Sequence, residues 1–109
     1  MADESTIDRA VADFENLAVL WAEQDGEARR MEKMEKIVFS ELVNQCNETS
    51  VAKAEHWARD HRRYREIVEQ VIGARTIANV TKAKLDAKEM RFEAWRTSQA
   101  TRRAEMSLR

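Results

Sequence analysis

Apolar residues recur at intervals of three and four along most of the chain, the spacing that places side chains on one face of an α-helix. In the first segment they run from Ile7 to Trp21, after Ser5, which opens a start resembling a capping box. The pair Asp25-Gly26 then lowers local helix propensity. The pattern therefore predicts a first helix that ends at this pair.

Two further helical segments follow. The second is predicted over Glu27–Cys46, where the polar stretch "NETS" interrupts the pattern and supplies Thr49 or Ser50 as an N-cap for the next helix. From Val51 nothing in the sequence stops a helix before the carboxyl terminus. Gly73 is the one glycine in this segment, and the sequence leaves open whether the helix kinks there.

A seven-residue apolar column runs down the last segment, as in coiled coils. The companion column is rich in charge, so a plain two-stranded zipper is not predicted. We expect the earlier helices to cover part of this long helix, and copies of the chain to cover the rest. We assign seven members of the column to an oligomer interface: Trp57, Tyr64, Val71, Ala78, Leu85, Phe92 and Met106. The sequence thus predicts an all-α fold, with two shorter helices followed by one long coiled-coil-like helix, in an oligomeric helical assembly.

The 109 residues, without proline and with two glycines, are sufficient for a single helical domain over residues 1–109. Its net charge of −1 conceals a strong polarity. Residues 1–48 hold 5 basic and 12 acidic side chains, whereas residues 75–109 hold 9 and 4. The domain is therefore expected to consist of acidic helices over 1–48 and a long, increasingly basic helix over 49–109. Such asymmetry between the two ends of the chain indicates nucleic-acid contact or head-to-tail self-association. In the alternative, the charges are simply distributed unevenly over a solvated helix surface.

Signals of catalysis are weak. The sequence has no glycine-rich phosphate loop and no nucleophile elbow, and His56 and His61 are five residues apart, which does not align two metal ligands on one helical face. We therefore predict no enzymatic activity, no catalytic residues, no metal and no cofactor. The single Cys46, the acidic amino terminus and the lack of a long apolar run predict a protein without a membrane segment, in a reducing cytoplasm.

Basic residues interleaved with aromatics remain as the candidate binding site. Cations neutralise phosphates, and neighbouring aromatic rings can stack on unpaired bases. In the other interpretation the arginines form ion pairs with the acidic front half and the aromatics fill the helical core. A core position is favoured for Tyr64 and Phe92, whereas both roles remain open for Trp95. The candidate nucleic-acid-binding residues are Arg62, Arg63, Arg75, Lys82, Lys84, Lys88, Arg91, Trp95, Arg96, Arg102 and Arg103.

The long segment, "AKAEHWARDHRRYREIVEQV" leading through "ANVTKAKLDAKEMRFEAWRTSQATRRAEM", resembles small phage proteins of the UvsY-like recombination-mediator family. The likeness covers about Glu27 to Met106, with Trp21 before its main part and the runs Trp95–Thr97 and Arg102–Met106 at its end. "KAKLD" at Lys82–Asp86 looks similar to a strand-binding Lys-Ala-Arg-Leu stretch of the family, although it lies later in the chain than that stretch would.

The resemblance implies a helical, ring-forming homo-oligomer that binds single-stranded DNA. It further implies that the protein loads a recombinase onto strands coated by single-strand-binding protein, without being an enzyme, in the host cell cytoplasm if a phage encodes it. A phage recombination mediator is thus the leading functional prediction. The alternatives are a structural or assembly coiled coil (a scaffold or adaptor) that binds no nucleic acid, and a small inhibitor that docks its acidic front on a host protein.

Overall fold

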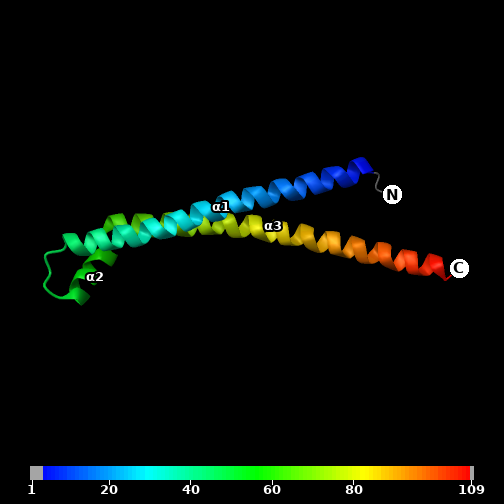
Figure 1. Ribbon diagram of the computed structural model, residues 1–109. Helices are drawn as coiled ribbons and strands as arrows, with labels where there is room; N and C mark the ends of the chain where they lie inside the picture. Colours follow the sequence, from blue (N-terminus) through cyan, green and yellow to red (C-terminus); the bar gives the residue numbers. More distant parts are fainter. Residues whose placement is uncertain (1–3, 109) are drawn as a thin grey trace. The chain divides into compact units, whose positions relative to one another are not determined.

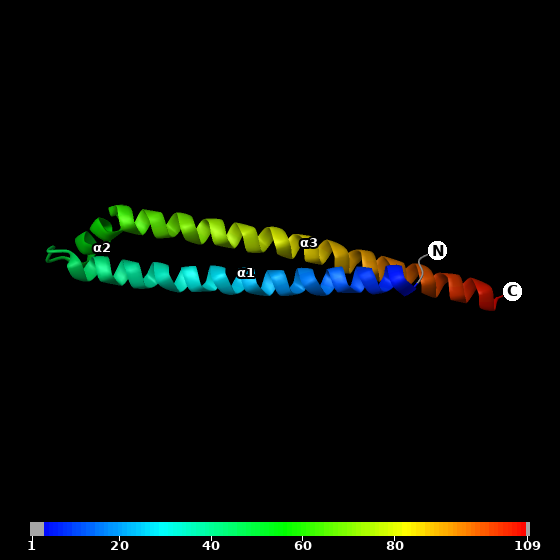
Figure 2. The ribbon, with the colours of Figure 1, turned by 90° about the horizontal axis from the view of Figure 1, so that it is seen from above.

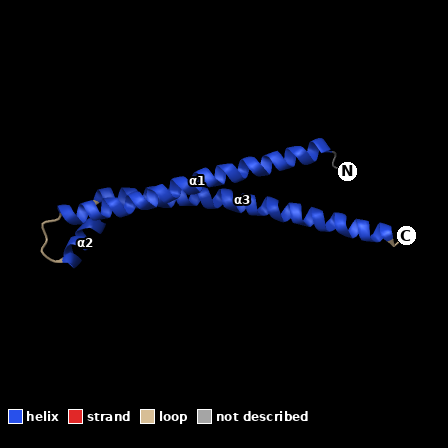
Figure 3. Cartoon of the chain, viewed as in Figure 1, coloured by secondary structure: helices blue, strands red, loops and turns tan. Residues whose placement is uncertain are grey.

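The computed structural model describes residues 4–108, which form three α-helices (Figure 1). Helix α1 spans Glu4–Gln45, α2 spans Val51–Asp60 and α3 spans Arg62–Ser107; the loop between α1 and α2 is the longest non-helical segment among these residues (Figure 3). The predicted all-α fold, with three helices of which the last is long, is confirmed. The chain divides into two compact units, Trp21–Asn79 and Met1–Leu20 with Val80–Arg109, which are described in turn.

In the unit Trp21–Asn79, the later part of α1 and the first part of α3 run antiparallel, side by side (Figure 2). The core of the unit is the buried cluster of Val38, Leu42 and Ala58, which joins α1 to α2. Partly buried Tyr64, at the start of α3, packs against this cluster and donates a hydrogen bond from its hydroxyl to Glu35 Oε1 at 3.2 Å. Burial, followed by this hydrogen bond, raises the pKa of the Tyr64 phenol above its ordinary value.

The predicted helix break at Asp25-Gly26 is wrong, because α1 continues through both residues. A glycine inside a helix costs only about 1 kcal/mol relative to alanine, which tertiary packing readily offsets. Here Ala28, two residues beyond the glycine, is fully buried, and Asp25 binds Arg75 of α3. Similarly, α3 continues without interruption through Gly73.

The predicted uninterrupted helix from Val51 is also wrong, because α2 ends at Asp60 and α3 begins at Arg62. Between them, His61 has extended backbone angles, φ −69° and ψ 137°, and its N–H donates to the Ala58 carbonyl. Its ring Nδ1 accepts a hydrogen bond from the Arg63 N–H at 3.1 Å, so His61 caps the start of α3 in the way a serine or aspartate commonly does. Of the two predicted caps, Thr49 and Ser50, it is Ser50 that caps α2, by accepting from the Lys53 N–H at 3.4 Å.

In the unit formed by Met1–Leu20 and Val80–Arg109, the first turns of α1 face the later part of α3. Ser5 lies inside α1, whose described part begins at Glu4. The rings of Phe14 and Phe92 meet edge to face, with centroids 5.7 Å apart, a favoured arrangement of two aromatic side chains. Thr81 and Leu85, in the same part of α3, are buried.

The seven-residue column expected to join copies of the chain is largely covered within one chain. Ala78 and Leu85 are buried, and Tyr64, Val71 and Phe92 are partly buried. Trp57 belongs to α2 and lies beside His61, and like Met106 it remains exposed. The face of α3 that carries the column therefore packs largely against other parts of the same chain.

Candidate nucleic-acid interface

The predicted cationic residues fall into two groups, according to whether a carboxylate already binds them. Arg75 is the most strongly paired: Nη1 lies 2.7 Å from Asp25 Oδ1, and Nη2 lies 2.8 Å from Glu32 Oε1. The hydrogen bond from Arg75 lowers the pKa of the Asp25 carboxyl, and the bonds to Asp25 and Glu32 raise the pKa of the guanidinium. Arg75 therefore joins α1 to α3 and is not available to bind a phosphate.

Three more of the candidates have a carboxylate partner at hydrogen-bonding distance. Two of these pairs lie along α3 itself, and the third connects α3 to α1. The pairs are Arg62 with Glu66 at 2.9 Å, Lys82 with Asp86 at 3.1 Å, and Arg63 with Glu41 of α1 at 2.7 Å. These exposed pairs contribute little stability, but a phosphate would have to compete with the carboxylate for each cation.

The remaining candidates have no such partner. Within residues 4–108, no ion pair or hydrogen bond involves the side chains of Lys84, Lys88, Arg91, Arg96, Arg102 or Arg103. Lys88 is half-buried and the other five are exposed. The candidate cations that precede Lys84 in the chain are therefore paired with carboxylates. Lys84 and the candidate cations after it are free among the described residues.

Helical spacing places most of the free cations together. Lys84, Lys88, Arg91, Trp95 and Arg102 follow one another at intervals of four, three, four and seven residues, so they share one face of α3, here called the basic face. The other positions of this face, at 98 and 99, are serine and glutamine, so no carboxylate interrupts it.

Arg96 and Arg103 lie on a different side of the helix. They are seven residues apart and continue the column of Lys82 and Glu89, which includes a carboxylate. The structure therefore does not bring these two arginines into the basic face. All described residues from 100 to 108 are exposed.

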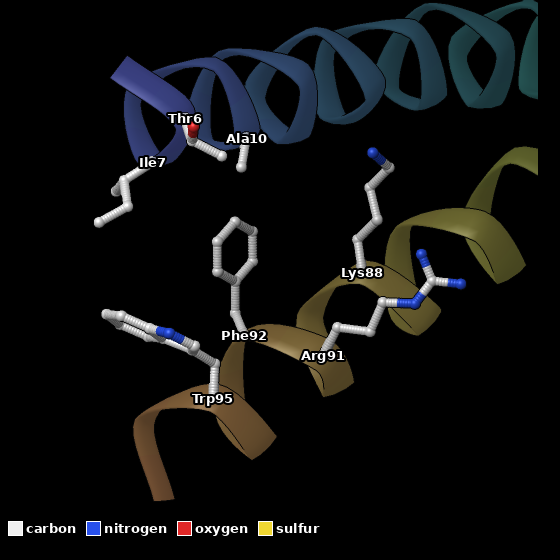
Figure 4. A pocket seen from close by; sticks show the side chains of 7 residues that line it. All are labelled: Thr6, Ile7, Ala10, Lys88, Arg91, Phe92 and Trp95. Carbon is white, nitrogen blue, oxygen red and sulfur yellow. The ribbon is translucent and has the colours of Figure 1, made fainter. Parts of the chain in front are cut away.

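Beside the basic face is a cleft of about 290 Å³ between α1 and α3 of the same unit (Figure 4). Phe92 and Trp95 point from α3 toward the first turns of α1, and Lys88 and Arg91 lie along one side of the opening. Trp95 is 46% exposed and has no ring contact with another described residue, whereas Phe92 is held by Phe14. The lining residues are Thr6, Ile7, Ala10, Lys88, Arg91, Phe92 and Trp95.

Three of these lining residues, Thr6, Ile7 and Ala10, were not identified from the sequence. They belong to the acidic front of the chain, and their role depends on which part of α3 they meet. Apolar spacing shows that Ile7 and Ala10 share a helix face. It does not show that this face lies against Phe92, more than eighty positions later along the chain.

Other chemistries find no support among the described residues. Within residues 4–108, no group of three or more histidine, cysteine, aspartate or glutamate side chains is arranged to hold a metal ion. No helix of this part of the chain has both the length and the apolar character needed to cross a membrane. Comparisons with protein-family models, with curated proteins and with solved structures find no match for the chain.

Proposed function

We propose that this chain is a non-enzymatic protein that binds single-stranded DNA along the basic face of α3. The observation that carries the proposal is the set of free cations on that face, which also presents the half-exposed Trp95. Each cation can neutralise a phosphate, and an indole ring can stack on a base of any sequence. Because the net charge of the chain is only −1, binding has to come from this local arrangement and not from overall charge.

A comparison of two double variants tests the basic face. Lys84→Gln/Arg91→Gln removes two charges from it, and Arg96→Gln/Arg103→Gln removes two charges from the same part of α3 on another side. The first should weaken binding to a labelled thymidine oligonucleotide at low salt by at least about tenfold, because hydrogen bonds to charged groups contribute ~1.5–3 kcal/mol each. The second should change affinity by no more than about threefold. Fluorescence anisotropy measures both.

Two outcomes would contradict the proposal. If the unmodified protein does not bind the oligonucleotide at low salt, it is not a single-strand-binding protein. If both double variants lose affinity equally, the basic face has no special role and only total charge matters. Circular dichroism of each variant excludes loss of helix as the cause.

The role in recombination is the second part of the proposal, and it is supported by the resemblance to the UvsY-like family. We propose that the strand-bound chain helps to load a recombinase onto DNA coated by single-strand-binding protein, acting as a homo-oligomer. The multiple weak cationic faces of an oligomer would raise avidity without new contacts. A loading assay with the recombinase and single-strand-binding protein of the same source tests this; equal loading rates with and without the chain would refute it.

One observation favours the alternative, a structural coiled-coil protein. On the side of α3 away from α1, Val80, Ala83, Ala87, Met90 and Ala94 recur at intervals of three and four and are all exposed. A charge-free stripe of this spacing is typical of a coiled-coil seam. The partner that fits it is a second copy of the chain, arranged in parallel.

Charges beside the stripe are consistent with that partner. Asp86 flanks it on one side and Arg91 on the other, so in a parallel pair the aspartate of one copy would face the arginine of its partner. Sedimentation equilibrium of the chain and of a Met90→Glu variant tests this. A dimer that dissociates in the variant, with no binding to DNA by either protein, would favour the structural role over the proposed one.

A further inference from the structure

The cleft beside the basic face offers a more specific inference, which rests on the proposed function. We propose that it holds one unpaired nucleobase, stacked on Trp95, while the phosphate of the same nucleotide binds Lys88 and Arg91. This would give the protein a preference for single strands over duplexes, because a paired and stacked base cannot enter the cleft without leaving the duplex.

The size and lining of the cleft match one base. Its volume of about 290 Å³ is at the lower limit of small-molecule sites, which suits a single planar group better than a whole cofactor. Ile7 and Ala10 of α1 face Phe92 and Trp95 of α3 across it (Figure 4). No carboxylate is among the lining residues, so none of them repels a phosphate.

The two aromatic walls differ in a way that fits stacking. Phe92 is fixed, since the edge of one ring meets the face of the other in its contact with Phe14, at an interplanar angle of 85°. Trp95 makes no such contact with any described residue and is nearly half exposed, so much of its surface is open to a ligand. A base stacked on Trp95 would cover apolar surface that is now open to water.

The cations are placed for the phosphate. Lys88 and Arg91 both line the cleft, and their side chains extend from α3 on the side of Phe92 away from Trp95 (Figure 4). Because both also belong to the basic face, the cleft adjoins the proposed path of the strand. Neither is bound by a carboxylate within residues 4–108. A strand that runs along the basic face could therefore turn one base inward without leaving its phosphate contacts.

The experiment compares a thymidine oligonucleotide with an abasic oligonucleotide of the same length and phosphate charge. The unmodified protein should bind the thymidine strand more tightly by about five- to 150-fold, the range for one stacked base. Ala10→Leu places a larger side chain in the cleft without removing any charge and should abolish this difference, leaving affinity for the abasic strand unchanged. Ala12→Leu, the same substitution at an exposed position of α1 that does not line the cleft, should leave the difference intact.

Each result has one meaning. Equal binding of both strands by the unmodified protein would overturn the base-binding cleft but leave the basic face standing. No binding of either strand would refute the proposed function itself. If Ala10→Leu weakened both strands equally, or if Ala12→Leu acted like Ala10→Leu, the effect would lie in the fold of α1 and the cleft would have no role.

Discussion

The salt dependence of DNA binding can be worked out from the number of free cations on the basic face. Four of them, Lys84, Lys88, Arg91 and Arg102, can each displace one condensed counterion from a strand. For single strands, the slope of log affinity against log salt is about −0.7 per phosphate contact, so four contacts predict a slope of about −2.8. An approximately fourfold rise in salt should then weaken binding about 50-fold.

Single substitutions make this prediction sharper. Arg102→Gln should reduce the slope to about −2.1, because one contact is lost. Arg63→Gln removes the same charge, but Arg63 is already bound to Glu41 and lies outside the basic face, so the slope should not change. Anisotropy titrations at four or more salt concentrations measure all three slopes. A slope near zero, or an equal reduction by both substitutions, would refute the assignment of free and paired cations.

Three further predictions concern stability, followed by thermal denaturation. Leu42→Ala should lower the free energy of unfolding by about 2–5 kcal/mol, because Leu42 is 1% exposed. The same change at Leu20, which is 43% exposed, should lower it by less than about 1 kcal/mol. Similar losses at both positions would contradict the described core. Gly73→Ala should stabilise by about 0.4–1 kcal/mol, since a Cβ there would meet nothing within 4 Å; destabilisation would show that something packs against this side of α3. Asp25→Asn should destabilise the protein at pH 7 and progressively less below about pH 4. Folding lowers the pKa of this carboxyl, so its contribution to stability is complete above the pKa of the unfolded state and is lost as pH falls through the pKa of the folded state. A difference in stability that does not depend on pH would exclude the ion pair with Arg75 as its cause.

Spacing in the sequence was sufficient for the fold class, because helical periodicity is a local property. The same reasoning narrowed the cap of α2 to Thr49 or Ser50, and Ser50 is the one that caps it. It failed where distant contacts outweigh local propensity, as at Gly26, where the ion pair of Asp25 and the burial of Ala28 favour a continuous helix. It also failed at His61, because histidine is not among the usual capping residues and the flanking "RDHRRYR" reads as continuous helix.

The candidate site was predictable in composition but not in arrangement. The sequence identified every cation of the basic face, yet it could not separate them from Arg63 and Arg75, because their carboxylate partners lie far away along the chain. Likewise, the cleft depends on residues near both ends of the chain. The pairing of distant helical segments depends on how two surfaces fit together. A single sequence shows which residues lie on each helix face, but not which faces are in contact.

The double ion pair of Arg75 also limits how the two helices can slide. A repeating apolar column tolerates slippage by one heptad, since each side chain then meets an equivalent neighbour. Asp25 and Glu32 are seven residues apart, and the equivalent positions before and after them are Ala18 and Phe39. Displacement by one repeat in either direction would leave the guanidinium with a single carboxylate, so this one arginine makes otherwise degenerate alignments unequal in energy.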